Sequence, residues 1–178
     1  NNKKISSVGT RMMSNYGKNF ITELIEGIAE FVTTIVSGLA YGCDIEAHSQ
    51  SLKNKVKTWS VMGTNFERIY PASHKKIAHE MLQNGGWITE QPSFRAVVPE
   101  AFLQRNRIIA GLSDVTIVVE SAFKGGSLVT AKFANEYNRE VFALPGKTTD
   151  ALSVGCNYLI KSQQAYLIEN SKEIIHYF

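Results

Sequence analysis

The sequence predicts a doubly wound α/β domain built on a mostly parallel sheet, and three observations support this. Short runs of apolar, often β-branched residues alternate along the chain with stretches of helical periodicity. These runs lack the apolar–polar alternation of a half-exposed strand, so we expect helices on both faces of the sheet. The 178 residues are enough for one domain with a sizeable core, and 44% of them are hydrophobic.

Six short apolar runs are the predicted strands, and glycine or proline follows several of them. They cover residues 5–8, 34–36, 59–62, 87–89, 115–119 and 141–144. The run 115–119 is the clearest, because every residue in it is β-branched. Parallel strands need a right-handed crossover between them, so the intervals must carry helices.

Helical periodicity is present in the intervals between the predicted strands. Residues 16–31 repeat apolar side chains at three- and four-residue spacing, which gives a helix with one apolar face. Shorter helices are predicted over residues 44–52, 74–82, 127–137 and 171–178. We expect Ser171 to cap the last helix, and Ser127 or the glycines before it to cap its own helix. Residues 91–101 and 145–154 are the least regular segments.

Charge and cysteine content exclude several classes of protein. The net charge is only +3 and no segment forms a basic tail, so an anion needs a local site of a few cations and backbone N–H groups. No apolar run approaches the ~18 residues that cross a bilayer, which argues against a membrane protein. Cys43 and Cys156 fit no disulfide or zinc pattern, so we expect reduced thiols in a cytoplasmic protein. No signal peptide is evident, and the missing initiator methionine suggests a trimmed start.

Ligands of parallel sheets bind where the carboxyl ends of strands turn into loops, and glycines gather at these positions. Four such loops are residues 9–11, 37–42, 63–65 and 124–127. Glycine lets backbone N–H groups approach a ligand, so each loop has the composition of an anion nest. An ordinary tight turn is the alternative for each loop alone. Neither G-x-G-x-x-G nor the P-loop pattern occurs, which disfavours a nucleotide cofactor.

Charged residues near these loops suggest supporting roles. Arg105 and Arg107 project to different faces of a helix, so we expect one to serve the ligand and the other to pair with a carboxylate, unless both are solvated. Glu120 directly follows the fifth predicted strand. We expect its carboxylate to orient Arg11, Lys124 or the arginine pair rather than to act in catalysis.

No pattern in the sequence marks a catalytic centre or a metal site. Serine and histidine are plentiful, but no G-x-S-x-G elbow or Cys–His pairing singles out a nucleophile. Asp44 and His48 are four residues apart and lack a third ligand at useful spacing, so we expect no metal there. His48 is more simply explained as a hydrogen-bonded structural histidine.

Seven short segments occur in a recognisable order. They are V-G-T-R at 8–11, V-S-G-L-A at 36–40, D-x-x-A-H at 44–48, I-Y-P at 69–71, R-N-R-I-I-A-G-L-S at 105–113, G-S-x-x-T-A at 126–131 and V-F-A-L-P-G at 141–146. Together they resemble the DNA-processing protein DprA family, also called Smf. The segment at 105–113 is highly specific, and the match extends from about residue 4 to about residue 168.

The resemblance implies an extended Rossmann-like domain that binds and protects single-stranded DNA. It further implies help in loading the RecA recombinase during natural transformation, the competence process. Members of the family look like binding modules rather than enzymes, and they form dimers through this domain. Many members carry a helical domain before it and a winged-helix-like domain after it, so residues 1–178 correspond to the core alone. The apolar segments 156–168 and 174–178 are candidates for the dimer surface, with ordinary core as the alternative.

The resemblance also implies roles for individual residues. Arg11 and Lys124 are expected to contact DNA phosphates, with Asp44 and Glu120 in support. Tyr41 stands where the family usually has arginine or lysine, so it either stacks on a base or weakens binding. Phe123 is a second candidate stacking platform, with core packing as its alternative. The other expected DNA contacts are Gly9, Ser37, Gly38, Gly42, Arg105, Arg107, Gly125, Gly126 and Ser127.

Two other functions fit the residues less well. A nucleotide phosphoribohydrolase carries the loop P-G-G-x-G-T-x-x-E, whose glutamate is catalytic. Alignment of that loop on Gly125 and Gly126 puts Ala131 and Lys132 where acids are needed. A nucleotide-sensing or protein-interaction module without DNA binding is the second alternative, and Tyr41 is the feature that favours it.

Overall fold

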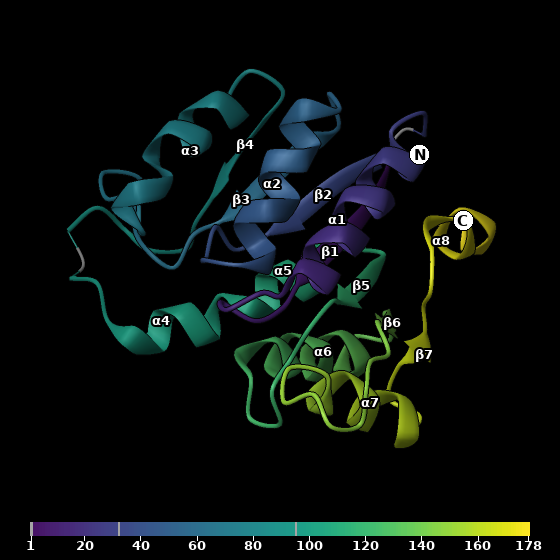
Figure 1. Ribbon diagram of the computed structural model, residues 1–178. Helices are drawn as coiled ribbons and strands as arrows, with labels where there is room; N and C mark the ends of the chain where they lie inside the picture. Colours follow the sequence, from purple (N-terminus) through teal and green to yellow (C-terminus); the bar gives the residue numbers. More distant parts are fainter. Residues whose placement is uncertain (1, 32, 95) are drawn as a thin grey trace.

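A wholly parallel sheet of seven strands forms the middle layer of the protein, with helices on both faces (Figure 1). The structure is a computed structural model that describes residues 2–31, 33–94 and 96–178. Within these ranges the strand order is β4-β3-β2-β1-β5-β6-β7. The strands are β1 (Lys3–Val8), β2 (Thr33–Ser37), β3 (Lys57–Val61), β4 (Gly85–Ile88), β5 (Val115–Val118), β6 (Glu140–Ala143) and β7 (Tyr166–Leu167).

The six predicted strands are all present, and the prediction of a mostly parallel sheet is confirmed. Their ends differ slightly from the prediction; Gly85 and Gly86, for example, lie inside β4 rather than before it. Strand β7 was not predicted. It contains only Tyr166 and Leu167, both exposed, so it is too short for an apolar period to reveal it.

Five helices were predicted, and all five are confirmed as α1, α2, α3, α6 and α8. Helices α4 and α7 extend into segments that looked irregular, because each is too short to repeat an apolar period more than once. The helices are α1 (Asn15–Ile28), α2 (Cys43–Lys53), α3 (Lys75–Met81, preceded by the 3-10 turn η1, Ala72–His74), α4 (Pro99–Gln104), α5 (Asn106–Leu112), α6 (Gly126–Glu136), α7 (Val154–Lys161) and α8 (Ser171–Tyr177).

The caps of α8 and α6 show which local signals decide a helix start. The prediction that Ser171 caps α8 is wrong, because the Asn170 side chain accepts a hydrogen bond from the Lys172 N–H and the Glu173 carboxylate accepts one from the Asn170 N–H. Helix α6 has Gly125 as its N-cap and no side-chain cap. The Leu128 N–H donates to the Gly125 carbonyl, while the N–H groups of Gly126 and Ser127 have no acceptor among the described residues.

The two faces of the sheet carry separate apolar cores. Ile5 and Ile117 pack against helices α1, α2 and α8 on one face. Val8 and Val118 pack against helices α5, α6 and α7 on the other, which lie below the sheet in Figure 1. Helix α3 lies beside α2, with Leu39 in a smaller cluster between them. This division explains why the strands are apolar on both sides.

The direction of winding reverses between β1 and β5. From β1 the chain builds outward through β2, β3 and β4, and then returns to build β5, β6 and β7 on the opposite side. Strands β1 and β5 are hydrogen-bonded neighbours, with Val8 in register with Val118. The loops that leave their carboxyl ends turn to opposite faces, which opens a crevice at this switch point.

Two sequence-based exclusions can be compared with the structure. Cys43 and Cys156 are free and buried, and burial is the main cause that raises the pKa of both thiols. None of the helices in the described ranges combines the length and the apolar character that a bilayer crossing demands.

Candidate functional site

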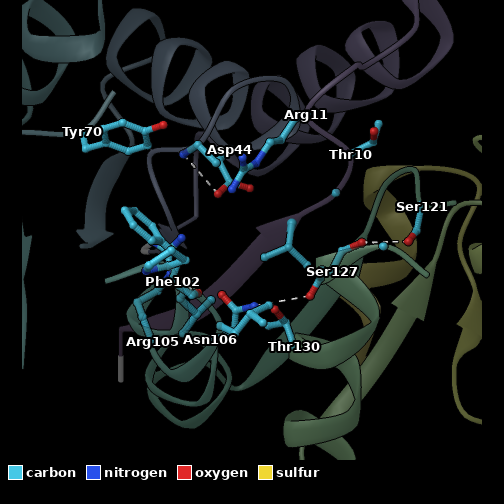
Figure 2. Close-up of a pocket in the computed structure, with 18 of the residues that line it drawn as sticks. Thr10, Arg11, Asp44, Tyr70, Phe102, Arg105, Asn106, Ser121, Ser127 and Thr130 are labelled. Carbon is cyan, nitrogen blue, oxygen red and sulfur yellow. Dashed lines mark hydrogen bonds between the residues drawn. The ribbon is translucent and has the colours of Figure 1, made fainter. Parts of the chain in front are cut away.

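A cleft of about 790 Å³ opens at the carboxyl ends of β1 and β5, at the switch point of the sheet. Its walls come from the loop after β1, the segment that contains α4 and the start of α5, and the loop that leads from β5 into α6. Figure 2 shows Arg11, Asp44 and Tyr70 along one side, with Asn106, Ser127 and Thr130 on the other. The expected convergence of loops at this edge of the sheet is therefore present.

Arg11 is an exposed side chain that lines this cleft, and the backbone around it is held from two directions. The Thr10 N–H donates to the Glu120 carbonyl at 2.7 Å, and the Cys43 N–H donates to the Thr10 carbonyl at 3.1 Å. Gly42 has a φ of 74°, and a Cβ there would stand 2.2 Å from the Thr10 carbonyl oxygen. The absence of a side chain at Gly42 is thus what lets the two loops touch.

Glu120 supports the Arg11 loop through a partner that the sequence did not suggest. It is buried, and its carboxylate accepts hydrogen bonds from the Ser14 N–H at 2.9 Å and the Ser14 hydroxyl at 2.5 Å. Ser14 in turn caps helix α1 by accepting from the Gly17 N–H. The prediction that Glu120 orients an arginine or Lys124 is therefore wrong; its carboxylate fixes the start of α1.

Arg105 is buried beneath the cleft and not displayed in it. One guanidinium nitrogen, Nη1, donates to the carbonyls of Gly38, at 2.6 Å, and of Val61, and Nε donates to the Phe102 carbonyl at 3.4 Å. Burial lowers the pKa of Arg105, and the negative charge of Asp44 opposes this. Arg105 therefore joins the loop after β2 and the end of strand β3 to helix α4.

Asp44 holds the loop after β2 from the other side. Its Oδ2 accepts from the Gly38 N–H at 3.2 Å and from the Ala40 N–H at 3.3 Å. Burial raises the pKa of this carboxyl, and the Arg105 guanidinium is the largest influence against the rise. Asp44 thus fixes the loop after β2, and its expected support of DNA binding stays a prediction.

Arg107 projects away from the cleft, as its place two residues from Arg105 predicts. It is exposed and forms an ion pair with Glu90, and it is not among the residues that line the cleft. The prediction that one of the two arginines pairs with a carboxylate is confirmed for Arg107. Neither arginine offers a free guanidinium to a ligand in the cleft, so their predicted DNA contacts gain no support.

Two of the four glycine loops are internal supports rather than anion nests. Ser37 is buried and its hydroxyl donates to the Ser7 carbonyl at 2.6 Å, while both backbone polar groups of Gly38 are already bonded. In the third loop Thr64 and Asn65 are buried and donate to backbone carbonyls. Ser37 and Gly38 are therefore reassigned from ligand contacts to the framework under the cleft.

The loop into α6 presents open donors to the cleft. Gly125, Gly126 and Ser127 line it, and the Ser127 hydroxyl donates to the Ser121 hydroxyl at 2.9 Å. Among the described residues no acceptor is recorded for the N–H groups of Gly126 and Ser127. Because they begin a helix of 11 residues, these N–H groups carry its partial positive charge and suit an anion.

Lys124 and Phe123 lie on the same loop but outside the cleft lining, and both are exposed. The Phe123 ring meets Tyr158 edge-to-face at 5.7 Å, and 59% of its surface is exposed, so the core-packing alternative is wrong. Tyr41 is also exposed and lines a small recess beside Arg11. The predicted DNA contacts of these side chains stay predictions.

The structure adds side chains that the sequence did not single out. Tyr70 and Phe102 lie together in the cleft wall with ring centroids 5.3 Å apart. Arg68, Asn106 and Thr130 also line the cleft. The I-Y-P, R-N-R and G-S-x-x-T-A segments contain Tyr70, Asn106 and Thr130. No local spacing relates Tyr70 and Asn106 to the glycine loops.

His48 has the structural role that was expected. Its Nδ1 lies 2.7 Å from the Thr58 hydroxyl, which donates to the Ile35 carbonyl, so His48 is the donor in this bond. Burial is the largest cause that lowers the pKa of His48 to about 3. Within the described ranges no three histidine, cysteine or acidic side chains gather as a metal site.

Comparison with known proteins shows that the chain is similar to the members of one protein family. Residues 1–178 match the family described as DNA recombination-mediator protein A. The DNA processing protein DprA of Bacillus subtilis is 40% identical over 172 residues, 97% of this chain and 58% of the relative. The X-ray structure of DprA from Streptococcus pneumoniae superposes with a TM-score of 0.90 at 35% identity, over 99% of this chain and 62% of that chain.

A second similar solved structure is that of DNA processing protein A from Helicobacter pylori, a structure that concerns the single-stranded DNA binding mode of that protein. It gives a TM-score of 0.89 at 31% identity and covers 98% of this chain and 79% of that chain. The chain spans about half the length of the curated relatives it matches, from 42% to 61%.

Proposed function

The chain belongs to the DNA recombination-mediator protein A family, that of DprA and Smf, and on this premise we propose that its cleft binds single-stranded DNA. One observation carries the proposal: exposed Arg11 and the open N–H groups of Gly126 and Ser127 meet in a single cleft. Both kinds of donor bind phosphate oxygens. The single-stranded DNA binding mode described for the Helicobacter pylori protein supports the choice of ligand.

The family is one of recombination mediators and is not catalytic, so the phosphoribohydrolase alternative is set aside.

The charges of the cleft favour a polyanion. Among the residues that the structure describes, the charged ones that line the cleft are Arg11, Arg68, Arg105 and Asp44. Because Arg105 and Asp44 are buried and close enough to oppose each other's pKa shifts, the two exposed arginines set the charge that a ligand meets.

Binding of this kind is sensitive to salt and largely blind to sequence. For a single strand, the logarithm of affinity falls with the logarithm of salt concentration by ~0.7 per phosphate neutralised. Lys124 lies outside the cleft and is proposed to meet a neighbouring phosphate, while Phe123 offers an exposed ring to a base there. Gly9 and Gly42 contribute by shaping the Arg11 loop rather than by contacting DNA.

We also propose a homodimer formed through the β7 edge of the sheet. Within the described part of the chain strand β7 pairs only with β6, and Tyr166 and Leu167 are 61% and 43% exposed. Tyr177 and Phe178 add apolar surface nearby, since both Tyr166 and Tyr177 pack on the Phe142 ring. Much of the remaining candidate segment is core, for example the buried Cys156, Leu159 and Ile168. Two clefts on one strand would raise avidity without new contacts.

The dimer proposal is tested by Leu167→Glu in sedimentation equilibrium. We expect wild type to sediment as a dimer and the variant to shift toward the monomer, because a buried unpaired carboxylate is costly. A variant that remains dimeric would place the interface elsewhere.

For the whole protein we propose the family's wider role in the cytoplasm: protection of incoming DNA and loading of the RecA recombinase in transformation and recombination.

The DNA-binding proposal is tested by fluorescence anisotropy with a labelled oligo-dT at several salt concentrations. We expect Arg11→Ala to weaken binding about fivefold or more, from the loss of ~1 kcal/mol or more in charge-assisted hydrogen bonds. Its salt slope should fall by ~0.7. Arg107→Ala is the matched control, because Arg107 lies outside the cleft, and it should bind like wild type. Equal affinities in all three proteins would overturn the proposal, and so would tight binding of thymidine monophosphate with none of the oligonucleotide.

A further inference from the structure

The cleft has two unlike ends. Toward α6 its lining is polar, with Ser121, Ser127 and Thr130 beside the open N–H groups. The other end is apolar and aromatic, and it continues into a small recess. The recess is lined by Arg11, Gly38, Ala40, Tyr41, Tyr70, Pro71, Phe102 and Arg105. Arg11 and Arg105 line both the main cleft and the recess. Because Arg105 is buried and its guanidinium is bonded to the Gly38 and Val61 carbonyls, exposed Arg11 is the cation that can meet a ligand there.

The aromatic residues of the recess are held in place by contacts of their own. Phe102 lies against Gly63 so closely that a Cβ there would come within 2.7 Å of its ring. Tyr70 meets the Phe102 ring at 5.3 Å with a tilt of 59°, yet it remains 49% exposed. The Tyr41 ring meets His74 edge-to-face at 4.7 Å, and its hydroxyl lies 3.1 Å from that of Ser73. These rings therefore need little ordering before a ligand stacks on them.

An exposed ring beside a cation matches one repeating unit of a nucleic acid strand, which joins a planar base to a phosphate. Aromatic side chains bind bases of any sequence, because every base offers a π face. Resting on the DNA-binding function proposed above, we infer that Tyr70 stacks on a nucleobase in the main cleft, at the mouth of the recess, while Arg11 holds the phosphate of that strand. Phe102 supports the Tyr70 ring from behind, and Tyr41 lines the slot instead of supplying a cation.

This assignment gives the aromatic end of the cleft a substrate class, a base within a single strand, and separates it from the phosphate site. Stacking on one aromatic side chain contributes about 5- to 100-fold in affinity per base. A duplex hides the faces of its bases in its own stack, so the slot also favours single strands.

The test compares labelled dT12 with a fully abasic phosphodiester of the same length, in the same salt. Wild type should prefer dT12. The variant Tyr70→Ala should bind dT12 about 5- to 100-fold more weakly and bind the abasic strand as wild type does, with an unchanged salt slope. Tyr70→Phe should keep the preference. Tyr137→Ala is the matched control, because Tyr137 is 43% exposed but packs on Phe133 outside the cleft.

The outcomes separate the two proposals. If Tyr70→Ala binds dT12 like wild type while Arg11→Ala still weakens it, the base slot is wrong and the phosphate site stands. Equal losses for dT12 and the abasic strand would also overturn the slot, because they would show a disturbed fold or backbone contact. If wild type binds neither strand, the DNA-binding function itself fails.

Discussion

The two arginines of the R-N-R segment should differ sharply in how much stability the same substitution costs. Arg105 is buried and donates to the carbonyls of Gly38, Val61 and Phe102, whereas Arg107 is exposed and pairs with Glu90. Lysine preserves the charge at either position but replaces the planar fork by one compact ammonium. The pair Arg105→Lys and Arg107→Lys therefore isolates the geometry of the buried guanidinium.

The expected loss follows from the hydrogen bonds. A hydrogen bond to a charged group contributes ~1.5–3 kcal/mol, and a buried carbonyl left without a donor costs a similar amount. A lysine ammonium at residue 105 loses at least one of the carbonyls that the guanidinium joins, so we expect a loss of about 2–3 kcal/mol. For a domain of this size that lowers Tm by about 4–12 °C. Arg107→Lys should change stability by less than about 1 kcal/mol, as is usual for an exposed ion pair.

Urea denaturation followed by circular dichroism measures the stability of both variants against that of wild type. The unfolding rates of the three proteins give a second measure of how far Arg105 stabilises the loops. We expect the midpoint to fall for Arg105→Lys alone, with an unchanged m-value. If the two variants were equally stable, Arg105 would not hold the loops together, and the framework described under the cleft would be wrong.

Other positions give independent tests. Gly42→Ala should lose about 1–3 kcal/mol of stability and weaken DNA binding, because it displaces the Arg11 loop. Gly86→Ala is the control and should be nearly neutral, because a Cβ there meets nothing within 4 Å. Similar denaturation midpoints for the two variants would contradict this prediction. Because His48 has its pKa lowered to about 3, the unfolded state takes up the proton first and stability is lost as pH falls below ~6.5. Between pH 7 and 5 wild type should lose about 2 kcal/mol more than His48→Gln, and parallel pH profiles would rule this out. Ser14→Ala should cost about 1–2 kcal/mol in thermal unfolding by removing a cap, and an unchanged Tm would deny that role.

The fold could be predicted because burial on both faces leaves a strong mark in the sequence. Each of the six predicted strands is an apolar run, and a run of this kind needs covering helices. The elements that were missed, α4, α7 and β7, are short or exposed, so tertiary contacts decide them rather than a local period. The Ser171 cap failed for a related reason, because Asn170 and Glu173 form a reciprocal pair that competes with it.

The site could be predicted only where sequence neighbours act together. The loops that carry Arg11 and Gly126 each combine glycine with a strand end, and both line the cleft. Burial decided the other roles: Arg105 and Glu120 are charged residues whose partners come from distant loops. The aromatic wall was missed because Tyr70 and Phe102 are 32 positions apart and meet only in the folded chain.

The most direct test is a crystal structure of the chain with a short oligo-dT. The account predicts a phosphate within hydrogen-bond distance of the Arg11 guanidinium and of the N–H groups of Gly126 and Ser127, with a base against Tyr70. A strand bound on another face of the sheet, with the cleft between β1 and β5 left free of nucleic acid, would contradict it.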